Sequence, residues 1–171
     1  VQSELAKQTI KDPYNFDFLT LRDKYDEREL EDALVKQITS FLLELGTGFS
    51  YIGRQVHLKV GDSDFYIDLL FYHVKLHCYV VVELKTEKFK PDFAGQLNFY
   101  VTAVNRDLKS QTIGILICKD KDNVVAEYSL ANISQPIGIS KYEISKLLEK
   151  EYKSSLPSIE EIEQSIKDIE K

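Results

Sequence analysis

The sequence predicts an α/β fold in which helices flank a mixed central sheet. Three runs rich in β-branched and aromatic residues follow one another closely, at residues 49–60, 65–72 and 79–85, which is typical of an antiparallel meander. Helical spacing of apolar residues precedes these runs and returns directly after them, and a short apolar run then follows. An α/β layer with a mixed sheet accounts for this order of elements.

Composition is that of a globular domain with one substantial core. The chain has 171 residues, of which 43% are hydrophobic and 29% charged. A formal net charge of −6 argues against a protein that binds nucleic acid over its whole surface, but it is compatible with a local basic face. No run reaches the roughly 18 apolar residues of a spanning helix, so we expect a cytoplasmic protein without membrane contact. The chain contains no Met, even at position 1, and we therefore expect it to be a piece of a longer polypeptide.

The individual elements can be placed from spacing and turn residues. An amphipathic helix is expected over residues 27–45, where Gly46 ends it. A second helix follows Pro91, with Asp92 as its cap. Residues 112–118 predict a strand buried on both faces. Weaker strands are expected at 123–130 and 136–140, and helices at 140–152 and beyond Pro157.

The turn between the second and third runs predicts a register. If the chain turns between Lys75 and Leu76, cross-strand partners have numbers that sum to 151, and Asp68 lies opposite Glu83. Alternation then gives one apolar face: Phe65, Ile67, Leu69, Phe71, Val80, Val82 and Leu84. The other face collects Tyr66, Asp68, Leu70, Tyr72, Tyr79, Val81, Glu83 and Lys85, so all three charges lie on it.

Two opposed carboxylates in a sheet suggest a cation site. Directly opposed residues have Cβ atoms about 4.5–5.5 Å apart, and the two charges would repel unless a cation or proton lies between them. Mg²⁺ accepts one or two carboxylates together with waters and phosphate oxygens. Lys85, two residues after Glu83, could then position a water or stabilise charge at phosphorus. The alternative from spacing alone is a partly exposed Glu83–Lys85 salt bridge, with Asp68 as a cap.

At these residues the sequence resembles the PD-(D/E)xK nucleases, which have a restriction-endonuclease-like core of helix, antiparallel meander, helix and strand. Asp68 matches the first acid, and "ELK" at 83–85 matches the ExK triplet. Four segments are similar, in order and spacing, to the bacterial YhcG-like family: "FLLELGTGFSYIGRQ", "FYIDLLFYHVKL", "VVELKTEKFKPDFAGQLNFY" and "TIGILICKDKDN". Members of that family usually carry a separate N-terminal domain, so the resemblance implies that one is missing from this chain.

The resemblance also implies roles for single residues. Asp68 and Glu83 would bind Mg²⁺ or Mn²⁺, and Lys85 would be the catalytic lysine. Glu31 matches an acid on the first helix near the metal, and Gln96 matches a polar residue on the second helix that faces the site. Without the resemblance, Glu31 would be interpreted as an ordinary charge at the edge of a helix stripe.

A further set of residues is expected to contact nucleic acid. Lys88 and Lys90 form a basic entry to the second helix, and Arg54 and Gln55 lie in the strand ahead of the hairpin, where they could touch a phosphate. Tyr100 lies one turn after Gln96 on the same helix face. Arg54 could equally be a surface side chain, and Gln96 and Tyr100 could be a simple helix-surface pair.

The sequence thus leads to a divalent-metal-dependent nuclease domain that hydrolyses phosphodiester bonds in DNA. The alternative is a catalytically silent nucleic-acid-binding or assembly module on the same fold. We expect residues 1–25 to be a linker or strap, residues 26–142 the nuclease-like domain and residues 143–171 a helical extension. In that extension Ile159, Ile162, Ile166 and Ile169 could pack on their own domain or pair with a second copy as a homodimer.

Overall fold

The computed structural model describes residues 2–145 and 159–169. Within them a six-stranded mixed sheet has the order β1-β6-β5-β4-β3-β2. Strands β2, β3 and β4 form the antiparallel meander, and β4, β5, β6 and β1 pair in parallel. The expected α/β fold with a mixed sheet is therefore confirmed. The strands are β1 (Tyr14–Asn15), β2 (Phe49–Val60), β3 (Ser63–His73), β4 (Cys78–Lys88), β5 (Thr112–Asp120) and β6 (Ile137–Glu143).

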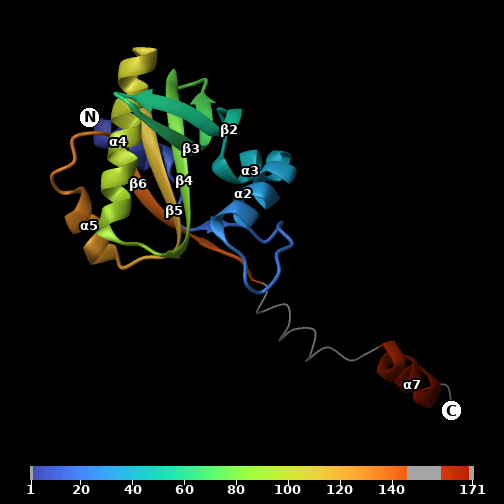
Figure 1. Cartoon of the computed structure of the whole chain (residues 1–171). Helices are drawn as coiled ribbons and strands as arrows, with labels where there is room; N and C mark the ends of the chain where they lie inside the picture. The colour runs from blue at the N-terminus through green and yellow to red at the C-terminus, as the bar shows by residue number, and fades with distance from the viewer. Residues whose placement is uncertain (1, 146–158, 170–171) are drawn as a thin grey trace.

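Helices cover both faces of the sheet (Figure 1). One apolar cluster joins the α4 and α5 side to the sheet, and another joins α2, α3 and the N-terminal segment to the opposite face. The parallel strands β4 and β5 are buried on both faces, which explains their continuous apolar runs. The helices are α1 (Gln2–Thr9), α2 (Glu27–Lys36), α3 (Ile38–Leu45), α4 (Pro91–Leu108), α5 (Asn123–Leu130) and α7 (Ile159–Ile169).

The predicted hairpin register is confirmed. The β3–β4 ladder runs from Leu69 opposite Val82 to His73 opposite Cys78, and each pair sums to 151. The last pair of the ladder is Leu69 and Val82, so Asp68 and Glu83 lie one residue beyond its end. The catalytic candidates therefore lie where regular pairing between the two strands ends.

One part of the predicted side-chain alternation is wrong. Leu69 and Phe71 pack with α2 and α3, as the alternation requires, but Phe65 and Ile67 pack on the α4 side together with Leu70. The alternation of β3 thus changes phase around Asp68. In the part of β3 that precedes Asp68, the side chains therefore lie on the face of the sheet opposite to the predicted one.

Residues close to the N-terminus are an integral part of the fold. β1 extends the sheet in parallel with β6, and the side chains of Tyr14 and Phe16 are fully buried. Phe16 packs against Phe41 with ring centroids 5.7 Å apart and against Tyr142 at 5.2 Å. The division into a linker, a nuclease-like domain and an extension remains a prediction, but residues 14–16 belong to the core.

The helix expected over residues 27–45 is divided in two. Gln37 has φ −107° and ψ 42°, which interrupts the helix between α2 and α3. Asp26 caps α2, since its carboxylate accepts a hydrogen bond from the backbone N–H of Glu29 at 2.9 Å. The expected Asp92 cap of α4 is wrong, because Lys90 holds the cap position and Pro91 is the first helical residue.

Two further expectations about secondary structure need correction. Residues 123–130 form a helix, α5, because the Asp122 carboxylate accepts hydrogen bonds from the N–H groups of Val124 and Val125 and so caps it. The strand β6 continues to Glu143, into the range where a helix was expected. The remainder of that expected helix, residues 146–152, lies outside the described residues.

The last described element, α7, is helical as expected. Its described side chains from Ile162 to Ile169 are exposed. Whether this stripe pairs with a second copy stays a prediction. None of the helices in residues 2–145 and 159–169 combines the length and apolar character that crossing a bilayer requires.

Candidate active site

Asp68 on β3 and Glu83 on β4 face each other at the end of the β3–β4 ladder. The Glu83 Oε1 atom accepts a hydrogen bond from the Asp68 backbone N–H at 3.1 Å. In return, Asp68 Oδ2 accepts one from the backbone N–H of Leu84 at 2.9 Å. These reciprocal bonds fix both carboxylates against the partner strand. The predicted juxtaposition of the two acids is therefore present.

Glu83 is a buried acid with an altered pKa. Only 3% of its surface is exposed. Burial, followed by the negative charge of Asp68, raises the pKa of Glu83 well above its ordinary value, while the ammonium of Lys85 opposes the shift. A cation between the two acids would remove much of this cost, because it would compensate both charges. The pair thus has the electrostatics of a site for a proton or a cation.

Glu31 on α2 lies beside this pair but is held by other groups. Its side chain is buried, Oε1 accepts a hydrogen bond from Arg54 Nε at 2.8 Å, and Oε2 accepts one from Gln55 Nε2 at 2.7 Å. Arg54 also forms an ion pair with Asp32. Burial and the charge of Asp68 raise the pKa of Glu31, and the bonds from Gln55 and Arg54 oppose this. Glu31 is thus positioned next to the acid pair by a paired network.

Gln55, which the sequence suggested as a phosphate contact next to Arg54, connects this network to Asp68. Its Nε2 atom also donates to Asp68 Oδ1 at 3.2 Å, so one amide contacts two carboxylates from different elements. The backbone of Gln55 has φ 46°, in the left-handed region that non-glycine residues seldom adopt. A register shift between Tyr51 and Gly53 lies just before it. No local sequence pattern indicates such a conformation for glutamine.

A cleft opens directly onto these groups. It has a volume of about 660 Å³ and lies between the start of α2 and the β2–β3 hairpin. The lining side chains are charged or polar: Glu27, Arg28, Glu31, Asp32, Arg54, Gln55 and Asp68. The expected contact residue Arg54 therefore borders the same space as Asp68. Its guanidinium forms ion pairs with Glu31 and Asp32 at the wall of the cleft.

Lys85 follows Glu83 on the same side of β4. Its ammonium lies over the ring of Phe93 on α4, 4.8 Å from the ring centroid. Among the ion pairs of the described residues, none involves Lys85. An aromatic ring, which does not neutralise the charge, thus holds the predicted catalytic lysine near the acids. No local sequence pattern indicates this contact between Lys85 and Phe93.

The α4 side of the site contains Gln96 and Tyr100. Gln96 is exposed, and its amide donates to the Tyr100 hydroxyl at 3.2 Å. Burial, together with the charges of Glu83 and Asp68, raises the pKa of Tyr100. The two residues do form a pair one turn apart on the helix surface, as the alternative interpretation held. Tyr100 nevertheless lies close enough to Glu83 and Asp68 for their charges to act on its hydroxyl.

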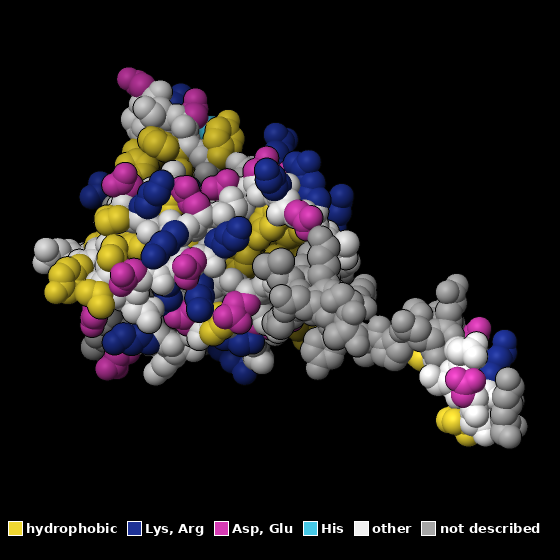
Figure 2. Space-filling model, turned by 90° about the horizontal axis from the view of Figure 1, so that it is seen from below, with side chains coloured by type: hydrophobic (Ala, Val, Ile, Leu, Met, Phe, Trp, Pro, Cys, Tyr) yellow, Lys and Arg dark blue, Asp and Glu magenta, His cyan; other side chains and the backbone are white. Residues whose placement is uncertain are grey.

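The remaining predicted contacts lie at the periphery. Lys88 and Lys90 are exposed near the end of β4, and Lys90 forms an ion pair with Glu87 at 3.4 Å. Within the described residues, no hydrogen bond or ion pair joins either lysine to Asp68 or Glu83. On the face in Figure 2, basic and acidic side chains are interspersed. A nucleic acid would therefore meet local basic groups on a surface of mixed charge.

The donor set suits a hard divalent cation. Carboxylate oxygens of Asp68 and Glu83 come from two adjacent strands, and Glu83 lacks an ion-pair partner among the described residues. No group of three His, Cys, Asp or Glu side chains able to share a metal ion occurs within residues 2–145 and 159–169. Asp68 and Glu83 are thus the described acids that lie against each other's strand, whereas the carboxylate of Glu31 is already bound by Arg54 and Gln55.

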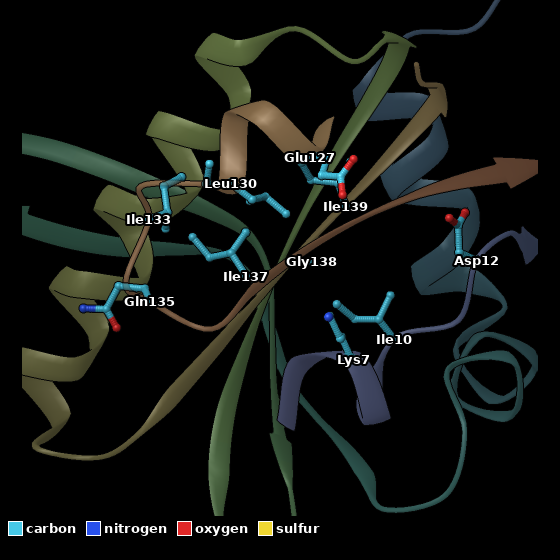
Figure 3. A pocket seen from close by; sticks show the side chains of 11 residues that line it. Lys7, Ile10, Asp12, Glu127, Leu130, Ile133, Gln135, Ile137, Gly138 and Ile139 are labelled. Atoms are coloured by element: carbon cyan, nitrogen blue, oxygen red, sulfur yellow. The ribbon is translucent and has the colours of Figure 1, made fainter. Parts of the chain in front are cut away.

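A second cavity, of about 480 Å³, lies away from the acids, between α1, α5 and β6. Figure 3 shows Leu130 and Ile137 on one side of it, with Ile10 and Lys7 on the other near Gly138. Its lining is mostly apolar, and Asp12 at its border is occupied by an ion pair with Lys121. It lacks the paired acids on which hydrolytic chemistry would depend.

Comparison with known proteins identifies the family of the chain. The model of the family described as the YhcG PDDEXK nuclease domain matches residues 7–157. The chain belongs to this family. It is 37% identical over 144 residues to the Escherichia coli (strain K12) protein named "Putative nuclease YhcG", and the match covers 82% of the chain but 38% of that relative. The YhcG PDDEXK nuclease domain thus spans well under half the length of this curated relative.

Solved structures share the fold of this YhcG PDDEXK nuclease domain. One, titled "Structure of EndoMS-dsDNA2 complex", has a TM-score of 0.52 and 18% identity and covers 73% of this chain and 48% of its own. Another is a repair endonuclease from Pyrococcus abyssi with a TM-score of 0.50 and 23% identity. The match covers 72% of this chain and 49% of the endonuclease chain. The restriction-endonuclease-like architecture expected from the sequence is therefore confirmed.

Proposed function

We propose that this domain is a divalent-metal-dependent nuclease that hydrolyses phosphodiester bonds in DNA. The observation that carries the proposal is the Asp68–Glu83 pair, fixed by reciprocal backbone hydrogen bonds at the end of the β3–β4 ladder. Membership in a nuclease-domain family supports hydrolytic chemistry at such a pair. The raised pKa of Glu83 supports cation binding, since a divalent ion would replace the proton that burial favours.

Asp68 and Glu83 would hold Mg²⁺ or Mn²⁺, with Glu31 as an additional or supporting acid. When bound, the metal polarises a phosphoryl oxygen and lowers the pKa of a coordinated water. Lys85 then orients the attacking water or stabilises the charge that grows on the phosphoryl oxygens. Its position over Phe93 favours this role, because the ring holds the ammonium in place and no carboxylate of the described residues forms an ion pair with it. Gln96 would order the water or the ligands on the α4 side through Tyr100.

DNA is the proposed substrate class. A solved structure with the same fold is a complex that contains double-stranded DNA, by its title. Arg54, Lys88, Lys90 and Tyr100 remain our proposed contacts to the nucleic acid. Lys88 and Lys90 are exposed and suit phosphates, whereas Arg54 and Tyr100 border the acids.

The direct test is cleavage of labelled nucleic acids in Mg²⁺, Mn²⁺ or EDTA. The panel contains single-stranded, duplex, flapped and four-way branched DNA, with an RNA strand for comparison. We expect metal-dependent cutting of DNA, which Lys85→Ala lowers by about 10²-fold or more while the protein stays folded. Lys75→Ala, which changes an exposed lysine in the turn between β3 and β4, serves as the control. Cutting by Lys85→Ala at the parental rate would remove the proposed role of this residue.

Metal binding separates the nuclease from the alternative of a silent binding module. Calorimetry with Mg²⁺ or Mn²⁺ should show a binding heat that Asp68→Asn removes. A protein that binds DNA without this heat, and without metal-dependent cutting, would be a module on a nuclease fold.

A further inference from the structure

The tip of the β2–β3 hairpin carries a face that the proposed chemistry does not use. Val56 and Leu58 on β2, and Phe65 and Ile67 on β3, pack on the α4 side. The residues that alternate with them point to the other face and are exposed or half-buried: Gln55, His57, Lys59, Asp64, Tyr66 and Asp68. This hairpin face is continuous with the active site, because Gln55 and Asp68 belong to both.

Two aromatic rings lie side by side on the hairpin face. His57 and Tyr66 are cross-strand partners whose ring centroids are 5.2 Å apart, tilted by 37°. Asp64 Oδ1 accepts a hydrogen bond from His57 Nε2 at 2.7 Å, which fixes the orientation of the imidazole. Tyr66 is 51% exposed, although tyrosine in a strand normally buries its ring. A ring pair that is oriented by its neighbours and open to solvent suits a planar ligand.

The distance from the acids matches one step along a nucleic-acid strand. Tyr66 precedes Asp68 by two residues on the same strand, and a strand rises about 3.3 Å per residue, so the two Cα atoms are roughly 7 Å apart. A phosphate held at Asp68 would therefore bring a neighbouring base to the ring of Tyr66. Lys59, two residues beyond His57 on this face, adds a positive charge next to the path of the backbone. Stacking on aromatic rings is a common means of binding single strands without regard to sequence.

We propose that Tyr66 and His57 form a stacking platform for an unpaired base next to the phosphate at the active site. This inference rests on the proposed nuclease function and adds its substrate class: DNA with a single-stranded segment. A closed duplex offers no free base face to the platform, because each base is already covered by its neighbours in the stack. A flap, an overhang or a single strand does offer one.

The test measures binding of two DNA ligands by the full 171-residue chain. Lys85→Ala is the background, so that the DNA stays intact in Mg²⁺. The ligands are fluorescein-labelled oligothymidine and a duplex closed at both ends by hexaethylene glycol linkers, so that it contains no unpaired base, with binding followed by fluorescence anisotropy. Tyr66→Ala removes the ring, Tyr66→Phe keeps it, and Tyr128→Ala is the matched control, since Tyr128 is an exposed tyrosine on α5. Circular dichroism verifies that each variant is folded.

We expect Tyr66→Ala to raise the Kd for oligothymidine by about five- to 100-fold and to leave the Kd for the closed duplex unchanged. Tyr66→Phe and Tyr128→Ala should bind both ligands as the Lys85→Ala protein does. A 2-aminopurine base in the strand should be quenched on binding, and Tyr66→Ala should abolish the quenching.

Three results would overturn the platform: parental affinity of Tyr66→Ala, an equal loss on both ligands, or no binding of oligothymidine before Tyr66 is changed. A change in molecular mass on Tyr66→Ala without DNA would assign the rings to a second copy of the chain instead. The binding assay does not require cleavage. Tyr66-dependent binding by a parent chain that never cuts would therefore count against the nuclease function alone.

Discussion

The amide of Gln55 donates hydrogen bonds to both Glu31 and Asp68, at 2.7 Å and 3.2 Å. These carboxylates come from α2 and β3, two elements far apart in the sequence. A neutral donor between two acids reduces their repulsion without using a cation. The spacing of the acids is therefore already set in the protein itself.

Removing this amide should weaken the fold in the absence of metal. Gln55→Ala leaves Glu31 and Asp68 without a shared donor, and we expect a loss of about 1 kcal/mol in the free energy of unfolding in EDTA. Gln55→Gly also lacks the amide but accepts φ 46° without strain, so it should be more stable than Gln55→Ala. Urea unfolding measures both. Equal stability of Gln55→Ala and the parent would show that the bridge contributes nothing.

The raised pKa of Glu83 predicts how stability depends on pH. Without metal the fold favours the protonated acid, so this contribution is complete below the ordinary value of 4.5 and is lost as pH rises through the higher pKa of the folded state. Glu83→Gln is neutral at every pH. In EDTA its free energy of unfolding should therefore exceed that of the parent increasingly as pH rises above 4.5, with a slope of at most about 1.4 kcal/mol per pH unit.

Thermal unfolding in EDTA across this pH range provides the measurement. Glu127→Gln, an exposed acid on α5, is the matched control and should follow the parent at all pH values. The prediction fails if Glu83→Gln and the parent keep a constant difference from acid to neutral pH.

Metal affinity should rise with pH for the same reason. A cation displaces the proton of Glu83, so binding of Mg²⁺ or Mn²⁺ becomes stronger as pH increases toward the raised pKa and then levels off. Calorimetry in two buffers of different ionisation enthalpy would detect the released proton. Binding that is independent of both pH and buffer would contradict a role of Glu83 as a ligand.

The contact between Lys85 and Phe93 should affect turnover more than binding. Phe93→Leu keeps an apolar side chain but removes the ring face under the ammonium, which is worth about 0.5–1 kcal/mol at an exposed site. We expect kcat to fall by about two- to fivefold with KM unchanged. Phe99→Leu changes an exposed ring on the same helix and is the control. A change in KM alone would show that Phe93 contacts DNA instead of positioning Lys85.

The buried ring of Phe16 should be essential for folding. It lies in the segment that the sequence assigned to a linker, yet it packs between Phe41 and Tyr142. Phe16→Ala should lower the free energy of unfolding by about 3–5 kcal/mol. Leu43→Ala, at a 79% exposed position, should stay within about 0.5 kcal/mol of the parent. A stable Phe16→Ala protein would instead support a dispensable linker.

The hairpin with its acids could be predicted because its determinants are local. Strict alternation in β3 and β4 and a short turn fix the register from Leu69 to His73. The apolar run of β5 likewise identified a strand buried on both faces. In this register the numbers of paired residues sum to 151, which places Asp68 opposite Glu83.

Other features depend on contacts that no local pattern reveals. The β-branched residues at the start of α5 indicated a strand. The carboxylate of Asp122, however, accepts hydrogen bonds from the first backbone N–H groups of this segment, and such a cap favours a helix. The change of phase at Asp68 and the left-handed Gln55 arise where α2 meets the hairpin. The burial of Phe16 requires β6, which lies more than a hundred residues later in the chain. The two acids could thus be predicted from the pattern of their strands, whereas the groups that support them are visible only in the folded structure.

The left-handed backbone of Gln55 also has a bearing on aggregation. β2 is an outer strand of the sheet and, at twelve residues, a long one, so its unpaired edge is the kind of surface on which a foreign strand can add. The register shift after Tyr51 and the turn of Gln55 away from extended geometry interrupt that edge near its middle. A chain approaching from outside would meet only short stretches of free backbone donors and acceptors. The same distortion that places an amide between two acids thus protects the sheet from growing beyond its own boundary.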